Sequence, residues 1–178
     1  MKIKKHINTE RRDFELSQLN EIELHENPFQ LFEDWLAFAI KNEINEPNAF
    51  CFSSVQNNKP SSRILYIRDV VENGFVFYTN YKSRKGMELT ENPNASMNFF
   101  WPEMERQIRI EGEIVKAPKD ISDAYFASRP RASQIGAWAS NQSSELASRE
   151  ELEKIIEEYT QKFEGNDVPR PDFWGGYI

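Results

Sequence analysis

The chain has 178 residues, a formal net charge of −7, one cysteine and two histidines. This length suits a single domain, predicted to span residues 1–178 with an N-terminal arm at 1–27. The acidic balance argues against non-specific nucleic-acid binding, and so few Cys and His argue against disulfides and against a zinc or non-haem iron site. With no apolar run of membrane-spanning length and no signal-peptide core, we expect a cytoplasmic protein that does not enter a membrane.

The first half of the chain is predicted to hold one helix and three strands. Pro28 suits the first position of a helix, and apolar residues at helical spacing follow it. From Ala49 the hydrophobic period changes to two, as in strands. The predicted elements are a helix from Pro28 to about Asn42 and strands at Ala49–Val55, Ser61–Val70 and Phe75–Thr79.

The second half alternates between the two patterns. Five strands with short connections indicate a mainly β fold with flanking helices (α+β), an antiparallel barrel or sandwich. The predicted elements are a helix at Arg84–Glu91, strands at Ala95–Trp101 and Gln107–Val115, a helix at Asp120–Ser128, a polar loop at Arg129–Trp138, a helix capped by Ser148 and Glu151, and a last strand within 166–178.

Two cations stand at the start of the predicted helix Arg84–Glu91. Ser83 is a good N-cap, which places Arg84 and Lys85 in the first turn, where the helix dipole is already positive. A phosphate bound there by free backbone N–H groups and both side chains would explain the arrangement. Two solvated charges on an exposed turn explain it equally well.

Further cations and amides are spread over the β scaffold. Arg63 and Arg68 flank an apolar strand segment, and each requires either a carboxylate, a ligand phosphate or contact with water. Together with the aromatic residues, these side chains suit a planar ligand that carries phosphate. Flavin mononucleotide (FMN) fits that description and would supply redox chemistry that side chains lack.

Several motifs resemble the pyridoxamine (pyridoxine) 5'-phosphate oxidase family, in order and over nearly the whole chain. These are Arg63-Ile-Leu-Tyr-Ile-Arg68, Gly74-Phe-Val-Phe-Tyr-Thr-Asn80, Ser83-Arg-Lys85, Glu105-Arg-Gln107, Tyr125-Phe-Ala-Ser-Arg-Pro-Arg131, Ser133-Gln-Ile-Gly-Ala-Trp138, Gln142-Ser143 and Phe173-Trp-Gly-Gly176. The resemblance implies an FMN-binding split β-barrel of antiparallel Greek-key type. It also implies a homodimer with FMN at the subunit interface, and oxidation of pyridoxamine or pyridoxine 5'-phosphate to pyridoxal 5'-phosphate by oxygen.

Site residues follow from the same motifs. The resemblance assigns FMN binding to Arg63, Ile64, Leu65, Tyr66, Ile67, Arg68, Tyr78, Thr79, Ser83, Arg84, Lys85, Gln107, Gln142 and Ser143. It assigns binding of the phosphorylated vitamin B6 substrate to Arg68, Tyr125, Arg129, Ser133, Arg11 and Phe14. No side chain is assigned as a catalytic acid or base, because the flavin carries the chemistry.

The chain departs from the family pattern at three places. Arg68 stands where the family usually has Lys, and Phe14 stands where it has Tyr. The chain ends at Ile178, whereas the family continues with a strand and an Arg-Leu-His segment. These departures leave two alternatives: a related flavin oxidase of the phenazine-biosynthesis type acting on another substrate, and a non-catalytic protein that binds FMN or pyridoxal phosphate.

Overall fold

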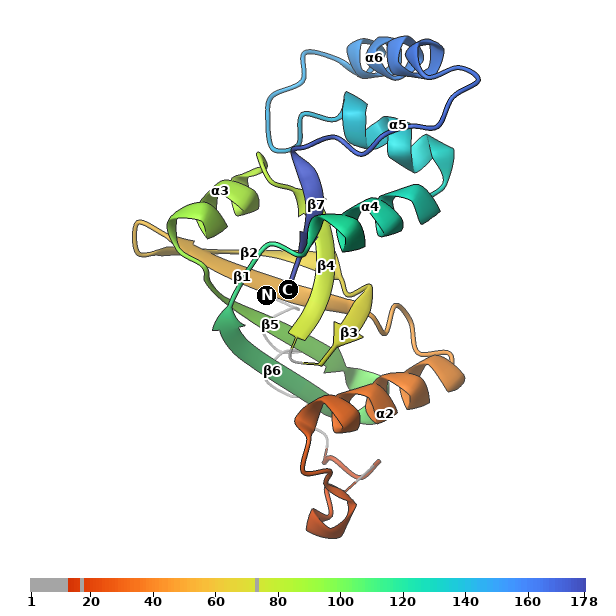
Figure 1. The fold of residues 1–178 in the computed structure, drawn as a ribbon. Coiled ribbons are helices and arrows are strands. Elements are labelled where there is room, and N and C mark those ends of the chain that lie inside the picture. Colours follow the sequence, from red (N-terminus) through yellow and green to blue (C-terminus); the bar gives the residue numbers. More distant parts are fainter. Residues whose placement is uncertain (1–12, 17, 73) are drawn as a thin grey trace, which may run out of the picture. The chain divides into compact units, whose positions relative to one another are not determined.

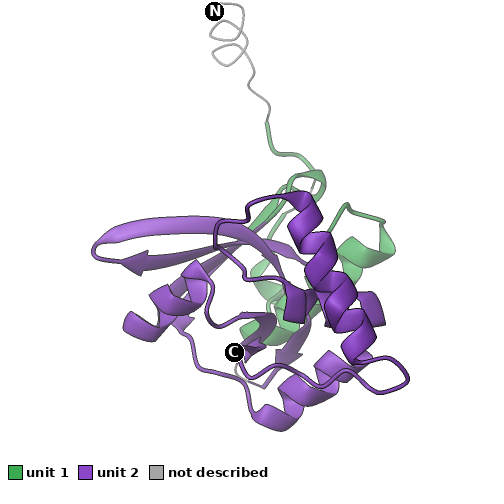
Figure 2. Ribbon diagram, turned by 90° about the horizontal axis from the view of Figure 1, so that it is seen from above, with its two compact units in different colours: residues 1–47, 100–108 green, residues 48–99, 109–178 purple. Residues whose placement is uncertain are grey.

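A computed structural model describes residues 13–16, 18–72 and 74–178. The chain forms two compact units, the first made of residues up to 47 together with 100–108, and the second of 48–99 and 109–178 (Figure 2). The elements, labelled in Figure 1, are η1 (Glu21–Glu23), α2 (Pro28–Lys41), β1 (Ala49–Gln56), β2 (Lys59–Tyr66), β3 (Asp69–Val71), β4 (Gly74–Asn80), α3 (Arg84–Glu91), β5 (Asn94–Trp101), η2 (Pro102–Met104), β6 (Arg106–Glu113), α4 (Lys119–Ser128), α5 (Arg131–Ala139), α6 (Arg149–Lys162) and β7 (Trp174–Tyr177).

The first unit is built around α2. Pro28 occupies the first turn of this helix, and the Asn27 side chain accepts a hydrogen bond of 2.9 Å from the backbone N–H of Phe29. Phe32 is buried and its ring lies 6.1 Å from that of Trp101. The apolar stripe seen in the sequence is therefore core, which confirms the predicted helix.

The strands form two antiparallel sheets. One has the order β2-β1-β5-β6 and the other the order β3-β4-β7. Strand β1 pairs with its hairpin partner β2 and also with β5, which follows much later in the chain. Asn57 and Asn58 at the β1–β2 turn both have positive φ angles, 51° and 58°, as a tight two-residue hairpin requires. The predicted mainly β fold with flanking helices is confirmed.

An aromatic core lies between the two sheets of the second unit. The buried rings of Phe50 and Phe52 from β1 meet the ring of Phe77 from β4, at centroid distances of 5.9 and 5.0 Å. Phe99 from β5 packs against Phe50 at 5.3 Å. Alternation along β1 explains this arrangement, because every second side chain faces the same side of a sheet.

The prediction of one continuous strand at Ser61–Val70 is wrong. The structure divides it into β2 and β3, which belong to different sheets. Between them, the Ile67 N–H donates to the carbonyl of Asn48 at 2.9 Å and the Arg68 N–H donates to the carbonyl of Val76 at 2.8 Å. Arg68 therefore lies where the chain crosses from one sheet to the other.

The predicted loop Arg129–Trp138 is also wrong, since most of it is helix α5. Pro130 ends α4 and, with a φ of −53°, suits the start of the next helix. The segment was interpreted as a loop because most of its residues are polar, but the helix has an apolar side on which Ile135 is buried. Helices α4, α5 and α6 follow one another beyond the same end of β4 and β7 (Figure 1).

A second cluster of buried side chains holds these helices to β7. It joins Phe126 of α4, Ile135 of α5, Phe163 after α6, Val168 and Trp174 of β7. Helix α6 begins as predicted, because the Ser148 hydroxyl accepts a hydrogen bond of 3.2 Å from the Glu151 N–H. None of the helices among the described residues is long and apolar enough to cross a membrane.

Candidate functional site

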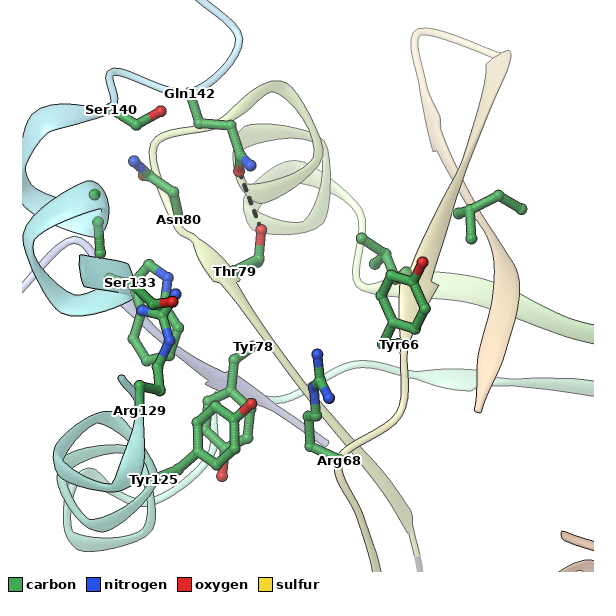
Figure 3. A pocket seen from close by; sticks show the side chains of 15 residues that line it. Tyr66, Arg68, Tyr78, Thr79, Asn80, Tyr125, Arg129, Ser133, Ser140 and Gln142 are labelled. Carbon is green, nitrogen blue, oxygen red and sulfur yellow. Dashed lines mark hydrogen bonds between the residues drawn. The ribbon is translucent and has the colours of Figure 1, made fainter. Parts of the chain in front are cut away.

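The second unit contains a cavity of about 430 Å³ at the meeting point of β2, β4, α4, α5 and β7 (Figure 3). The ends of three strands meet two helices there, so side chains far apart in sequence share one wall. Ten residues that the sequence assigned to ligand binding line it: Ile64, Leu65, Tyr66, Arg68, Tyr78, Thr79, Tyr125, Arg129, Ser133 and Gln142.

Five further lining residues were missed by the sequence analysis: Asn80, Gly136, Ala137, Ser140 and Trp174. Four of them, all except Ser140, stand inside motifs quoted for the family resemblance, and those motifs could have indicated them. Gly136 and Ala137 lie on α5, which had been interpreted as a loop, and Ser140 follows this helix directly. Small side chains on that helix leave room for a ligand.

The amine of Lys85 lies behind one end of the cavity, in contact with two residues that line it. Its Nζ donates to Thr79 Oγ1 at 3.0 Å, to Ser83 Oγ at 3.2 Å and to Gln142 Oε1 at 2.9 Å. Thr79 and Gln142 line the cavity, so Lys85 stands immediately behind its wall. The predicted cap is present as well, because Ser83 Oγ accepts from the Gly86 N–H at 3.4 Å. The start of α3 therefore faces this end of the site.

Lys85 is a buried lysine, because only 7% of the residue is exposed. Burial, together with the nearby positive charge of Arg63, lowers the pKa of Lys85 to about 8, although Glu88 opposes this effect. A buried ammonium without a full counter-charge is costly, and a bound anion would remove that cost. Of the two interpretations of Lys85, the solvated surface charge is wrong.

Arg63 and Arg84 both contact Glu88 and do not line the cavity. Arg63 Nη2 lies 2.9 Å from Glu88 Oε2, and Arg84 Nε lies 2.8 Å from Glu88 Oε1. The partner of Arg63 is thus a protein carboxylate, one of the alternatives that the sequence left open. Arg84 keeps 67% of its side chain exposed.

Stacked aromatic rings form the other side of the cavity. The Tyr78 and Tyr125 rings lie 3.8 Å apart and are nearly parallel, and the Tyr78 and Trp174 rings lie 5.6 Å apart. The Arg129 guanidinium lies 4.5 Å above the Trp174 ring. Figure 3 shows Arg129 and Arg68 at opposite sides of the stacked tyrosines.

Arg129 has an unsatisfied donor, because its buried Nη1 has no hydrogen-bond partner in the described part of the chain. Burial lowers its pKa, Tyr125 acts in the opposite direction, and the charge of Arg68 lowers it further. A buried guanidinium nitrogen without an acceptor is unusual in a folded protein, and an anionic ligand would satisfy it. Ser133, on the same wall, offers a hydroxyl to the same ligand.

The remaining assigned residues lie elsewhere. Ile67 is buried and Ser143 is exposed in the loop after α5, with a φ of 71°. Gln107 and Phe14 belong to the first unit, and Phe14 is 74% exposed. Arg11 lies outside the described residues. The structure therefore brings together the assigned residues of the second unit that line the cavity.

Comparison with known proteins identifies the family. The family model described as "Pyridoxamine 5'-phosphate oxidase" matches residues 36–163. A pyridoxine/pyridoxamine 5'-phosphate oxidase of Trichormus variabilis is 47% identical over 167 residues, which are 93% of this chain and 78% of the relative. The chain belongs to the pyridoxamine 5'-phosphate oxidase family. An oxidase of the same name from Paraburkholderia phytofirmans is 48% identical over 94% of this chain and 78% of its own length.

Solved structures agree on the fold. PhzG from Burkholderia lata 383, crystallised with tetrahydrophenazine-1-carboxylic acid, superposes with a TM-score of 0.84 at 31% identity, covering 91% of this chain and 81% of PhzG. A pyridoxamine 5'-phosphate oxidase-related, FMN-binding protein of Nostoc punctiforme superposes with a TM-score of 0.65 at 14% identity, covering 86% and 81%. The second likeness concerns the fold alone. The family's architecture of antiparallel sheets with flanking helices is therefore the one found here.

Proposed function

We propose that the protein oxidises pyridoxamine or pyridoxine 5'-phosphate to pyridoxal 5'-phosphate, with FMN as cofactor and oxygen as electron acceptor. The observation that carries this proposal is one cavity with two separate groups of anion-binding side chains. Lys85 with Thr79 and Gln142 forms one group, and Arg129 with Ser133 forms the other. Two phosphate-binding ends suit a phosphorylated cofactor and a phosphorylated substrate in the same site.

The side chains present fit FMN. Its phosphate would be held by Lys85, Arg84 and the backbone N–H groups at the start of α3. The Ser83 hydroxyl is buried and donates to the Asn80 carbonyl at 2.6 Å, so it caps the helix and does not face the phosphate. Thr79 and Gln142, with Tyr66 and its neighbours on β2, would hold the rest of the molecule along the cavity. When bound, FMN supplies the two-electron acceptor that the side chains themselves lack.

The chain's own residues bind and orient the substrate. Arg129 offers the unpaired Nη1 to the substrate phosphate, and Ser133 and Tyr125 stand on the same wall. The stacked rings of Tyr78, Tyr125 and Trp174 are rigid and apolar, so they exclude water from that side. Arg68, in place of the family's usual Lys, brings a planar fork of donors to the cavity instead of a single ammonium.

The test is the visible spectrum of the protein reconstituted with FMN, followed by addition of pyridoxamine 5'-phosphate without oxygen. We expect a flavin absorption band that bleaches and that returns on admission of oxygen. Failure to bind FMN would refute the cofactor assignment. A flavin band that does not bleach would refute the substrate and leave two alternatives, binding without turnover and oxidation of another substrate.

A second candidate activity is oxidation of a different, phenazine-like substrate. The likeness to PhzG, with its TM-score of 0.84, favours it. The unpaired Arg129 Nη1 argues for a phosphorylated substrate instead, because the PhzG ligand is named as a carboxylic acid and a phosphate offers more acceptor oxygens. Comparing the bleaching rates with pyridoxamine 5'-phosphate and with tetrahydrophenazine-1-carboxylic acid separates the two activities.

We also propose that the protein is a homodimer with the cofactor at the subunit interface. Ile64 lines the cavity and yet is 60% exposed, and it lies on β2, at the edge of its sheet. A second subunit over this strand would cover the apolar side chain and close the cavity. Light scattering coupled to size-exclusion chromatography should give twice the mass of the chain, and a monomeric mass would refute the proposal.

A further inference from the structure

Glu88 is a buried carboxylate behind the phosphate end of the proposed flavin site. It lies on α3, and its side chain is 1% exposed. An ionised carboxylate at such depth requires several donors, since burial without them is costly. Sequence analysis assigned it no role.

Four side chains supply those donors. Ser54 Oγ donates to Glu88 Oε2 at 2.5 Å, and Ser61 Oγ donates to the two carboxylate oxygens at 2.8 and 2.7 Å. Arg63 Nη2 and Arg84 Nε complete the set at 2.9 and 2.8 Å. Burial alone would raise the pKa of Glu88, but these hydrogen bonds lower it to about 2. The carboxylate is therefore ionised at neutral pH.

The contact with Arg84 leaves the far end of that guanidinium available. Glu88 takes the Nε hydrogen, while the two Nη groups have no protein partner among the described residues. Both Nη groups of Arg63, by contrast, already have protein partners. Nη1 donates to Ser54 Oγ at 2.6 Å and Nη2 donates to Ser61 Oγ at 2.6 Å. One carboxylate thus holds two guanidiniums that would otherwise repel each other beside Lys85.

We propose that Glu88 is a positioning residue that makes the flavin site selective for a phosphomonoester dianion. It orients Arg84 toward the ligand and neutralises one of three clustered cations, so that Arg63, Arg84, Lys85 and Glu88 together carry a formal charge of +2. That charge matches a doubly ionised phosphate. The inference rests on the proposed function, because it assumes that this end of the cavity receives the FMN phosphate.

The distinguishing readout is the ratio of affinities for FMN and riboflavin, which differ only by the phosphate. Glu88→Gln keeps the size of the side chain but removes its charge, so it releases Arg84 and leaves the cations to repel one another. We expect FMN affinity to fall about tenfold, as for loss of an oriented charge-assisted contact, and riboflavin affinity to stay within about twofold. A merely structural role would weaken both flavins alike.

The experiment titrates the 178-residue apoprotein with each flavin and follows flavin fluorescence. Glu91→Gln is the matched control, because Glu91 lies on the same helix, is exposed and carries the same charge. Ser61→Ala is a milder variant that removes one donor to Glu88 and no charge, and we expect about a threefold fall in FMN affinity alone. Circular dichroism checks that each variant is folded, and if Glu88→Gln does not fold, Ser61→Ala decides by the same ratio.

A fall in the FMN-to-riboflavin affinity ratio in Glu88→Gln, with no fall in Glu91→Gln, supports the proposal. An unchanged ratio, or tighter FMN binding once the negative charge is gone, overturns it while leaving the proposed function intact. Wild-type protein that binds neither flavin overturns the proposed function, and this inference with it.

Discussion

Replacing Lys85 by Met tests whether the protein maintains a buried charge at the expense of stability. The ammonium is 7% exposed, and its pKa falls from 10.5 to about 8 in the folded chain. At about 1.4 kcal/mol for each pKa unit, this corresponds to a cost on the order of 3 kcal/mol at neutral pH. The three hydrogen-bond acceptors of Nζ, on Thr79, Ser83 and Gln142, are neutral and supply no counter-charge.

The sign of the pH dependence follows from proton binding. Between about pH 8 and pH 10.5 the unfolded chain holds the Lys85 proton and the folded chain does not, so the free energy of unfolding rises with pH. From pH 7 to pH 10 the expected rise is on the order of 2 kcal/mol. Lys85→Met should lack this rise. It should also bind FMN at least about tenfold more weakly, because a charged donor to the phosphate is lost.

The assay is urea denaturation of the apoprotein, followed by Trp fluorescence at several pH values from 7 to 10. Burial raises the pKa of Tyr177 from 10.0 to about 12, so this residue lowers stability between those pH values, and the upper limit keeps the measurement below that window. Lys82→Met is the matched control, since Lys82 is exposed and lies three residues earlier. If Lys85→Met shows the same rise in stability as the wild type, the reasoning about the buried charge is refuted.

Three further substitutions test other parts of the site. Arg129→Leu should raise the KM for pyridoxamine 5'-phosphate by about 10- to 100-fold and leave FMN binding unchanged, and an unchanged KM in steady-state kinetics would contradict its phosphate role. Trp174→Leu should lower the free energy of unfolding by about 2–4 kcal/mol in urea, because the ring is buried in the second cluster, and a loss below about 1 kcal/mol would disprove its place there. Gly86→Ala should lower the free energy of unfolding by more than about 2 kcal/mol, because the new Cβ would overlap the Tyr81 carbonyl. Gly112→Ala is the control and should cost much less, because the space around Gly112 is open. Equal thermal stability of the two variants would argue against the close contact at Gly86.

Local signals in the sequence predicted most of the elements. The helix start at Pro28, the Ser83 cap of α3 and the Ser148 cap of α6 are all present. Each of the two caps is a hydrogen bond between residues three apart, so it depends on local sequence alone. Two elements were misjudged. The break between β2 and β3 depends on pairing of the backbone at Arg68 with Val76, and the helix α5 depends on burial of residues such as Ile135 against other helices.

For the site, composition and motifs predicted a ligand class, and ten of the residues that they assigned to ligand binding line the cavity. They did not assign Trp174, whose ring joins the stack of Tyr78 and Tyr125 only after β7 has paired with β4. The motif around it was visible, but no spacing rule relates residues of a C-terminal strand to a helix some fifty residues earlier.

The sequence by itself determined the mainly β architecture, the capped helix start beside Arg84 and Lys85, and the family. Only the tertiary structure decided which cations contact a carboxylate and which do not. Arg63 and Arg84 share the single carboxylate of Glu88, whereas Lys85 is buried against neutral oxygens and Arg129 keeps an unpaired nitrogen. The physical reason is that a charge is stabilised by whatever lies within a few ångströms of it. For Glu88 and Ser54 that neighbour is 34 residues away along the chain.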